Sequence, residues 1–433
     1  MNIKSSIQMA RAYRRDPLGY VGHLIQTHGS RVVVDIFGRK LIVLTNPADV
    51  LHVLKENNAS YTKGRTTKKL IKFMGKGLIT NEGDDWRRQH RLIRPVMNLK
   101  SVLETGPKMQ QTVLEFVKKL DISKEVNVFY ELNRLTWRIV LNTLFTQEAT
   151  AEMDGWLEDV LYLMESITKK TRTLLPVPFW IPTPDNVRFK KVIKRFDDYV
   201  YKIIAERRSG ERKKDLLQLL IDAQDEGTTN GMSDLQIKDE IMTFLLAGHE
   251  TITNSMSWTL ITLAQNKQYL EGLKQESKVF FEHQNYEELN SMPLLSAVMD
   301  EMFRLWPPVW VFMRQAEAED KMDGLTIPKK ANVIVSPFFT QRSPDLWDKP
   351  ETFYPERFFS EPKKKIIPGA YFPFGLGPRA CIGAYFATLE AKIILANFIQ
   401  HFEWDFVNQE VQTHEAGITL RPTNNILMKF RRR

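Results

Sequence analysis

One glycine-rich segment constrains this chain more than any other: Phe374-Gly375-Leu376-Gly377-Pro378-Arg379-Ala380-Cys381-Ile382-Gly383. Cys381 is the only cysteine among 433 residues, so it cannot belong to an internal disulfide or a multi-cysteine zinc site. It stands just before an apolar, helix-like run from Ala384 to Phe398. Free N–H groups and the dipole at a helix N-terminus stabilise a thiolate. Such a thiolate can be a nucleophile, a redox sensor or an axial ligand to haem iron, and the simplest alternative is a buried, inert cysteine.

The segment fits the pattern F-x-x-G-x-x-x-C-x-G without a gap. Gly375 and Gly377 allow tight turns that bring the backbone close to a flat partner, and Gly383 leaves room beside the sulfur. Arg379 can reach a carboxylate on that partner. In these features the segment resembles the haem-binding loop of the cytochrome P450 family. The resemblance implies that Cys381 is the axial ligand of haem iron and that haem is also bound by Phe374, Gly375, Arg379 and Gly383.

A long helical pattern runs from Ser233 to Asn266 and would span roughly 50 Å. Its middle reads Ala247-Gly248-His249-Glu250-Thr251, which resembles the P450 oxygen-activation motif A/G-G-x-D/E-T. Ala247 and Gly248 remove bulk from the helix, although Gly248 costs ~1 kcal/mol of helix stability relative to alanine. The resemblance implies that Ala247 lies against the haem and that the catalytic residues are Thr251, which hydrogen-bonds the oxygen ligand, and Glu250, which relays protons. Ile252 departs from the Thr or Ser that often follows.

A third motif, E-x-x-R, is formed by Glu301 and Arg304, one helical turn apart. In the P450 family this pair is completed by an arginine in a later segment, and Arg357 in Phe353-Tyr354-Pro355-Glu356-Arg357-Phe358 matches it. The resemblance implies a structural role, in which the three residues brace the core on the haem side.

Trp86 and His90 are four residues apart and therefore share one face of a helix. The resemblance implies that both side chains approach the haem propionates, although arginine is commoner than histidine at the position of His90. Arg314 and Arg379 match further propionate-binding arginines of the family. Arg87, Arg91 and Arg94 form a second, basic stripe on the same helix. The stripe is either a solvated face or, together with Lys363 to Lys365, a docking surface for a redox partner.

Substrate contacts are implied at positions that line the distal pocket in this family. The candidates are all apolar and favour a lipophilic substrate such as a fatty acyl chain, a terpenoid or a polyketide: Leu78, Ile79, Leu246, Ala247, Val309 and Val311.

The resemblance implies a mainly α cytochrome P450 fold, with a large helical region around a long central helix and a small β-rich region. The runs 31–37 and 41–44 predict a hairpin in that β-rich region. One catalytic domain would cover residues 1–433, with haem b as cofactor and no fused reductase, so that electrons come from a ferredoxin or flavodoxin with its reductase. The net charge of +9 suits an acidic protein partner, and no nucleic-acid motif is seen. No apolar run is long enough for a transmembrane anchor, and we expect a cytoplasmic enzyme.

The implied reaction is the insertion of one atom of O2 into the substrate, by hydroxylation or epoxidation. Two other enzymatic roles stay open, a peroxygenase and a peroxide-rearranging isomerase, although both tend to lack the acid-threonine pair found here. A haem sensor is a further alternative, and no coupled output domain is visible for it.

Overall fold

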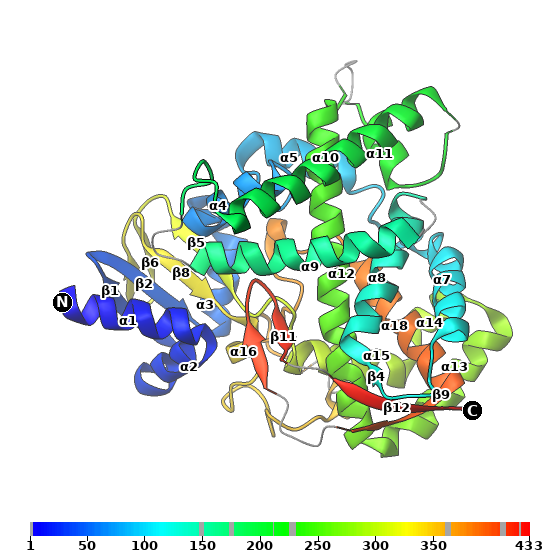
Figure 1. The fold of residues 1–433 in the computed structure, drawn as a ribbon. Helices are drawn as coiled ribbons and strands as arrows, with labels where there is room; N and C mark the ends of the chain where they lie inside the picture. Colours follow the sequence, from blue (N-terminus) through cyan, green and yellow to red (C-terminus); the bar gives the residue numbers. More distant parts are fainter. Residues whose placement is uncertain are drawn as a thin grey trace.

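The computed structural model describes residues 3–146, 151–172, 177–210, 212–224, 231–359, 365–407, 413–423 and 426–433. A small region rich in β-strands lies at the N-terminal side and a large helical region makes up the rest (Figure 1). The fold is therefore mainly α, as predicted from the sequence. Among the described residues, no helix combines the length and the hydrophobicity needed to span a lipid bilayer.

The β-rich region is built around a sheet of five strands in the order β1-β2-β8-β5-β3. Its bounds are β1 (Arg31–Ile36), β2 (Arg39–Leu44), β3 (Tyr61–Thr62), β5 (Phe312–Ala316) and β8 (Asn332–Val335). The hairpin predicted for 31–44 is confirmed, since β1 pairs with β2 antiparallel and Val34 faces Leu41. The helices α1 (Ile3–Arg15) and α2 (Pro17–His28) contact β1. After β2, Asn46 caps the short helix α3 (Pro47–Leu51) through its side chain.

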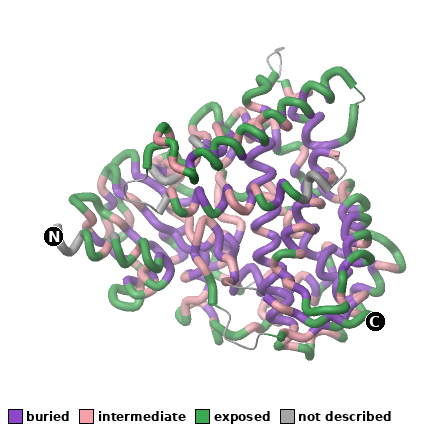
Figure 2. Tube along the Cα trace, viewed as in Figure 1, coloured by how far each residue is buried: buried purple, intermediate pink, exposed green. Residues whose placement is uncertain are grey.

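The long helix α12 (Asp234–Gln265) runs through the middle of the molecule (Figure 1). Ser233 caps it with a full capping box, in which the Ser233 hydroxyl accepts from the Gln236 N–H and the Gln236 side chain accepts from the Ser233 N–H. Most of its side chains are buried (Figure 2), because helices pack around it on several sides. The helix predicted for 233–266 is thus confirmed to within one residue at each end.

The long helix α12 and the helices packed around it form the largest part of the hydrophobic core. The helices α8 (Val128–Leu144) and α18 (Ala384–His401) pack most extensively against α12. The helix α10 (Pro184–Ser209) also contacts α12, and α9 (Ala151–Arg172) packs against α8 and α10 (Figure 1). The remaining helices are α4 (Gly64–Met74), α5 (Gly83–Ile93), α6 (Leu99–Leu103), α7 (Gly106–Lys119), α11 (Leu216–Asp222), α13 (Leu270–His283), α14 (Tyr286–Ser291), α15 (Pro293–Leu305) and α16 (Pro337–Thr340).

Three smaller sheets complete the described structure. Their strands are β4 (Val126–Asn127), β9 (Phe402–Phe406) and β12 (Leu427–Arg432) in one, β6 (Asp320–Met322) and β7 (Leu325–Ile327) in another, and β10 (His414–Ala416) and β11 (Leu420–Pro422) in the third. The β10–β11 hairpin contacts α12, so its turn reaches the middle of the long helix.

Candidate functional site

A cavity lies between α12, the N-terminal end of α18, α5 and the segment from Gly75 to Asn81. The volume open to a water-sized molecule is about 180 Å³, below the roughly 300–1,000 Å³ that is usual for ligand sites. The structure brings most of the predicted site residues to its wall: Leu78, Ile79, Trp86, His90, Ala247, Thr251, Arg379, Cys381 and Gly383.

The cysteine loop owes its shape to two glycines with positive φ, Gly375 at +75° and Gly377 at +69°. A Cβ on Gly377 would lie 2.2 Å from the carbonyl oxygen of Leu54, so only glycine fits there. The loop closes where the Cys381 N–H donates to the Phe374 carbonyl at 2.7 Å, and α18 begins three residues after Cys381. The loop therefore holds the sulfur at a fixed place in front of a helix N-terminus.

The Cys381 sulfur is exposed at the cavity wall, although protein atoms crowd the residue on its other sides. This burial raises the pKa of the thiol, and the backbone N–H of Gly383 opposes the shift. A thiolate at this place is consequently unfavourable until a cation faces it. The environment suits a metal ligand better than a free nucleophile. Phe374 is not at the wall and packs edge-to-face against Phe303, with ring centroids 5.1 Å apart.

Four basic side chains meet at one end of the cavity. Arg379 stacks over Trp86, with its guanidinium 3.7 Å from the ring centroid, and forms an ion pair with Glu82. His90 lies beside Trp86, at 5.0 Å between ring centroids, and burial followed by the charges of Arg94 and Arg379 lowers its pKa. Arg314 is buried behind the wall, and burial and Arg379 lower its pKa to about 10.

Lys63 is the fourth basic residue, and the sequence reasoning missed it. Its side chain lines the cavity and donates to the carbonyl of Ile79. Burial, together with the charges of Arg379 and Arg314, lowers its pKa to about 7. Glu82 is the one acidic group acting on this cluster among the described residues. The cluster therefore has more positive charge than its protein partners neutralise, and it fits an anionic ligand.

The acid-threonine pair on α12 is divided between two faces of the helix. Thr251 reaches the cavity wall, and its hydroxyl donates to the carbonyl of Ala247 at 2.9 Å. Glu250 is buried on the adjacent face, where it accepts a hydrogen bond from Thr419. Gly248 also lines the cavity, and a Cβ there would lie 3.1 Å from a methyl group of Val140 on α8. Both the open wall and close helix packing thus require this glycine.

Three predicted pocket residues lie outside the wall of this cavity. Leu246 packs into the helical core, because it precedes Ala247 by about 100° of helix rotation. Val311 packs between the sheet and the N-terminal helices, and Val309 is half-buried near the end of α15. The described apolar wall is instead completed by residues that sequence reasoning did not select: Met97, Leu144, Phe244, Ile382 and Phe386.

Glu301, Arg304 and Arg357 meet as the motif implies. Arg304 makes a two-pronged ion pair with Glu301, at 2.7 and 2.9 Å, and both side chains are fully buried. Arg357 donates to the same carboxylate at 3.2 Å, and Arg304 also donates to the carbonyl of Gln341. The brace therefore ties α15 to the segments that precede the cysteine loop.

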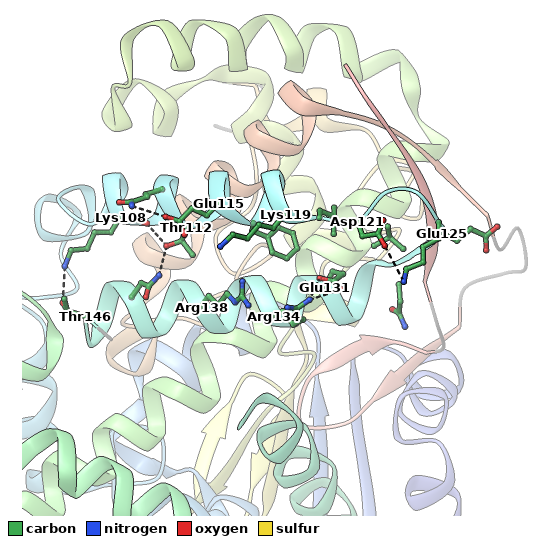
Figure 3. A pocket seen from close by; sticks show the side chains of 17 residues that line it. Lys108, Thr112, Glu115, Lys119, Asp121, Glu125, Glu131, Arg134, Arg138 and Thr146 are labelled. Carbon is green, nitrogen blue, oxygen red and sulfur yellow. Dashed lines mark hydrogen bonds and ion pairs between the residues drawn. The ribbon is translucent and has the colours of Figure 1, made fainter. Parts of the chain in front are cut away.

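A larger groove, with about 890 Å³ open to a water-sized molecule, lies at the surface between α7 and α8 (Figure 3). Several of its charged side chains interact with one another or with neighbouring hydroxyls, as between Arg134 and Glu131 and between Lys108 and Thr146. The groove is open to solvent and contains none of the predicted site residues, so the smaller cavity at Cys381 is the candidate site.

The basic stripe predicted on the Trp86 helix is exposed on α5, where Arg87 pairs with Asp84. Arg91 and Arg94 are exposed as well. Lys363 and Lys364, which the sequence suggested as part of the same surface, lie outside the described residues.

Comparisons with known proteins agree with this geometry. The family model described as Cytochrome P450 matches residues 5–430. The chain is 28% identical to cyclooctatin synthase and to cyclooctat-9-en-7-ol 5-monooxygenase of Streptomyces melanosporofaciens, over 88% of this chain and 84% of each relative. It is 29% identical to echinocystic acid 23-monooxygenase of Saponaria officinalis, over 85% of this chain and 75% of that protein. The crystal structure of the cytochrome P450DA heme domain superposes with a TM-score of 0.86 and 24% identity, covering 96% of this chain and 93% of that one.

Proposed function

Because this chain belongs to the cytochrome P450 family, with monooxygenases among its relatives, we propose that it inserts one oxygen atom of O2 into a lipophilic, terpenoid-like substrate. One observation carries the proposal: a single cavity joins the only thiol of the chain, a cluster of cations and the hydroxyl of Thr251. We further propose that residues 1–433 form one catalytic domain and that a separate ferredoxin or flavodoxin supplies the electrons.

The residues of the cavity fit haem b. Cys381 offers one sulfur ligand from a loop shaped by glycines, and Ala247 and Gly248 keep the opposite wall low. The excess positive charge of Lys63, Arg379 and Arg314 matches the two carboxylates of this cofactor. When bound to a thiolate, haem supplies the reduction and cleavage of O2.

The chain's own residues would serve this chemistry in separate ways. Cys381 would give up its thiol proton and hold the iron, while Arg379, Lys63 and His90 would hold the propionates and Trp86 would support Arg379. The apolar wall of Leu78, Ile79 and Phe244 would bind substrate and exclude water. The hydroxyl of Thr251 would hold a proton at the oxygen-binding position, and Glu250 would resupply that proton.

The substrate class is supported by the wall and by the relatives. The residues at the distal wall are apolar, which suits a molecule with few polar groups. Two relatives are named for cyclooctat-9-en-7-ol and echinocystic acid, which favours a terpenoid over a fatty acyl chain. The intact Glu250–Thr251 pair favours O2 activation over the peroxygenase or isomerase alternatives.

The reduced, carbon-monoxide difference spectrum of the purified protein tests the proposal. We expect the red-shifted Soret band of a haem-thiolate in the wild type and its loss in Cys381→Ser. Titration with cyclooctat-9-en-7-ol, echinocystic acid and palmitate should then show a spin-state change for the terpenoids. A spectrum typical of histidine ligation, or a protein that binds no haem, would overturn the proposed function.

A further inference from the structure

The side chain of Glu250 forms a hydrogen bond with a residue that the proposed function does not use. Its Oε1 accepts a hydrogen bond from the Thr419 hydroxyl at 2.8 Å, across 169 residues of sequence. Both side chains are more than nine-tenths buried. The other carboxylate oxygen, Oε2, is buried and has no hydrogen-bond partner in the described part of the protein. Thr419 therefore fixes one oxygen of Glu250 and leaves the second one available.

Thr419 itself is held at a defined position. It belongs to the turn between β10 and β11, which is closed by the hydrogen bond from the Gly417 N–H to the Thr419 carbonyl at 2.8 Å. The indole of Trp310 donates to the Gly417 carbonyl at 3.1 Å, and the Leu420 N–H donates to the Pro308 carbonyl at 2.8 Å. The turn is thus fastened to the segment after α15, and this leaves the Thr419 hydroxyl little freedom to move away from Glu250.

A second polar side chain lies one helical turn beyond Glu250. Asn254 is fully buried on α12, and neither its Nδ2 nor its Oδ1 has a hydrogen-bond partner among the described residues. Residues four apart on a helix are neighbours on its surface. Buried amide and carboxyl groups are nearly always hydrogen-bonded, to protein or to ordered water. The free oxygen of Glu250 and the free amide of Asn254 are therefore two polar groups, one helical turn apart, that a bound water would satisfy.

The hairpin also brings charge close to this carboxyl. Burial raises the pKa of Glu250, while the hydrogen bond from Thr419 and the charge of Arg421 lower it and Glu415 raises it. Arg421 and Glu415 pair with each other at 2.7 Å at the stem of the hairpin, where both side chains are about one-third exposed. The carboxyl thus lies between the cavity side of α12 and a partly solvated ion pair.

We propose that Thr419 is a positioning residue for proton delivery: its hydroxyl anchors Glu250 so that the free oxygen, beside Asn254, binds the water that resupplies protons to Thr251. This inference rests on the proposed function. Productive turnover consumes one O2, two protons and two electrons and converts R–H into R–OH and water. When protons arrive at the wrong oxygen, the same two electrons and two protons leave as hydrogen peroxide.

The first measurement is an infrared pH titration of the Glu250 carboxyl in the haem-loaded protein, with the protonated C=O band assigned by its loss in Glu250→Gln. Thr419→Val removes a donor that favours the carboxylate, so we expect its midpoint to move to higher pH than in the wild type. Thr419→Ser keeps the hydroxyl and should titrate as the wild type does. Thr413→Val, on the exposed stem of the same hairpin, is the matched control and should cause no shift. If valine prevents folding, Thr419→Ala removes the same hydroxyl.

The second measurement is the share of electrons lost as peroxide, with a surrogate plant-type ferredoxin, its NADPH-dependent reductase and cyclooctat-9-en-7-ol as probe. We expect the peroxide share to rise in Thr419→Val, to rise further in Glu250→Gln and to return to the wild-type value in Thr419→Ser. An unchanged midpoint and peroxide share in Thr419→Val would overturn the inference, as would a serine variant that behaves like valine. The proposed function is tested apart from this, because its failure appears as a missing thiolate Soret band in the wild type itself.

Discussion

The lowered pKa of Lys63 indicates what kind of ligand the cavity binds. A lysine with a pKa of about 7 among arginines is unfavourably charged in the protein alone. Burial and the charges of Arg379 and Arg314 cause this shift, and a carboxylate placed beside Lys63 would reverse it. The residue is therefore suited to an anionic ligand rather than to the folded chain by itself.

Binding of iron releases the thiol proton of Cys381 at both pH 6 and pH 8, because burial raises the pKa of this thiol. We predict that haem binding to the haem-free protein therefore releases up to about one proton fewer at pH 8 than at pH 6. At pH 8 Lys63 is mostly neutral, and a propionate raises its pKa so that it gains up to about one proton per chain. At pH 6 it already carries the proton. Calorimetry in two buffers of different ionisation enthalpy measures the net release. Lys63→Met should remove this difference and Lys190→Met, on the exposed surface of α10, should keep it; an equal difference in both variants would contradict the prediction.

Residues carried by a local pattern were predictable from the sequence, whereas residues that depend on distant segments were not. Cys381, Arg379, Trp86 and Thr251 were found because each belongs to a short motif, and the structure places all four at one cavity. Lys63 and Thr419 were missed, because their partners come from elsewhere in the chain: Ile79 and Arg379 for Lys63, and Glu250 for Thr419. No spacing rule connects such positions.

At the scale of elements, Gly377 in the cysteine loop and Gly29 at the end of α2 both have a positive φ but differ in what surrounds them. Gly377 needs a positive φ and also lies against the backbone of Leu54 and Lys55, which cannot yield to a side chain. Gly29, at the end of α2, has a positive φ of 80° but nothing within 4 Å of an added Cβ. A side chain at Gly29 would therefore cause backbone strain alone, whereas a side chain at Gly377 would also clash with neighbouring backbone atoms.

We predict that Gly29→Ala, at φ 80° and ψ −159°, lowers the free energy of unfolding by about 1–3 kcal/mol and leaves the haem-thiolate spectrum unchanged. Gly377→Ala also places a side chain at a positive φ and must in addition displace the segment around Leu54 or the cysteine loop itself. We expect it to lose the thiolate Soret band or much of its haem content. Urea unfolding and the carbon-monoxide spectrum measure both effects, and a normal spectrum in Gly377→Ala would show that the loop can shift without harm.

The brace between α15 and the later segments is a second element-scale feature. Glu301 neutralises Arg304 with both side chains fully buried, so removing the acid leaves a buried charge without its partner. We predict that Glu301→Gln lowers the free energy of unfolding by roughly 3–5 kcal/mol. Lys194→Ala breaks the exposed pair with Asp198 and should cost less than about 0.5 kcal/mol. Denaturant unfolding compares them, and equal costs would contradict a structural role for the brace.

Element types were easier to predict than element rotation. The span of α12 followed from its periodicity and from Ser233 at its start, and the hairpin followed from two β-branched runs. Leu246 was assigned to the pocket although it faces the core, because a one-residue step turns a helical side chain by about 100°. Val311 likewise follows the alternation of the strand it precedes and packs toward the N-terminal helices.

At the scale of the whole molecule, the basic stripe on α5 is the candidate surface for an acidic redox partner. Arg87, Arg91 and Arg94 are exposed on the same helix that presents Trp86 and His90 to the cavity. A partner docked there would lie close to the cationic end of the site. The net charge of +9 would steer an acidic protein toward the chain from a distance.

We predict that reversing these three charges to glutamate slows reduction by an acidic ferredoxin and weakens its dependence on salt. The control reverses the exposed Lys118 and Lys119 at the end of α7 and the exposed Lys124 in the segment after it, which changes the net charge equally on another element. Stopped-flow reduction at several ionic strengths measures both variants. If the control is slowed as much as the α5 variant, net charge rather than docking determines the rate.

A practical consequence follows from the place of Cys381. The chain has one sulfhydryl, and it lies at the wall of the cavity where the iron would be held. A chromogenic thiol reagent would therefore react once with each molecule that lacks the cofactor and not at all with a loaded one. The amount of coloured reagent product per chain thus gives the fraction of molecules without haem, and no absorption spectrum of the haem is needed.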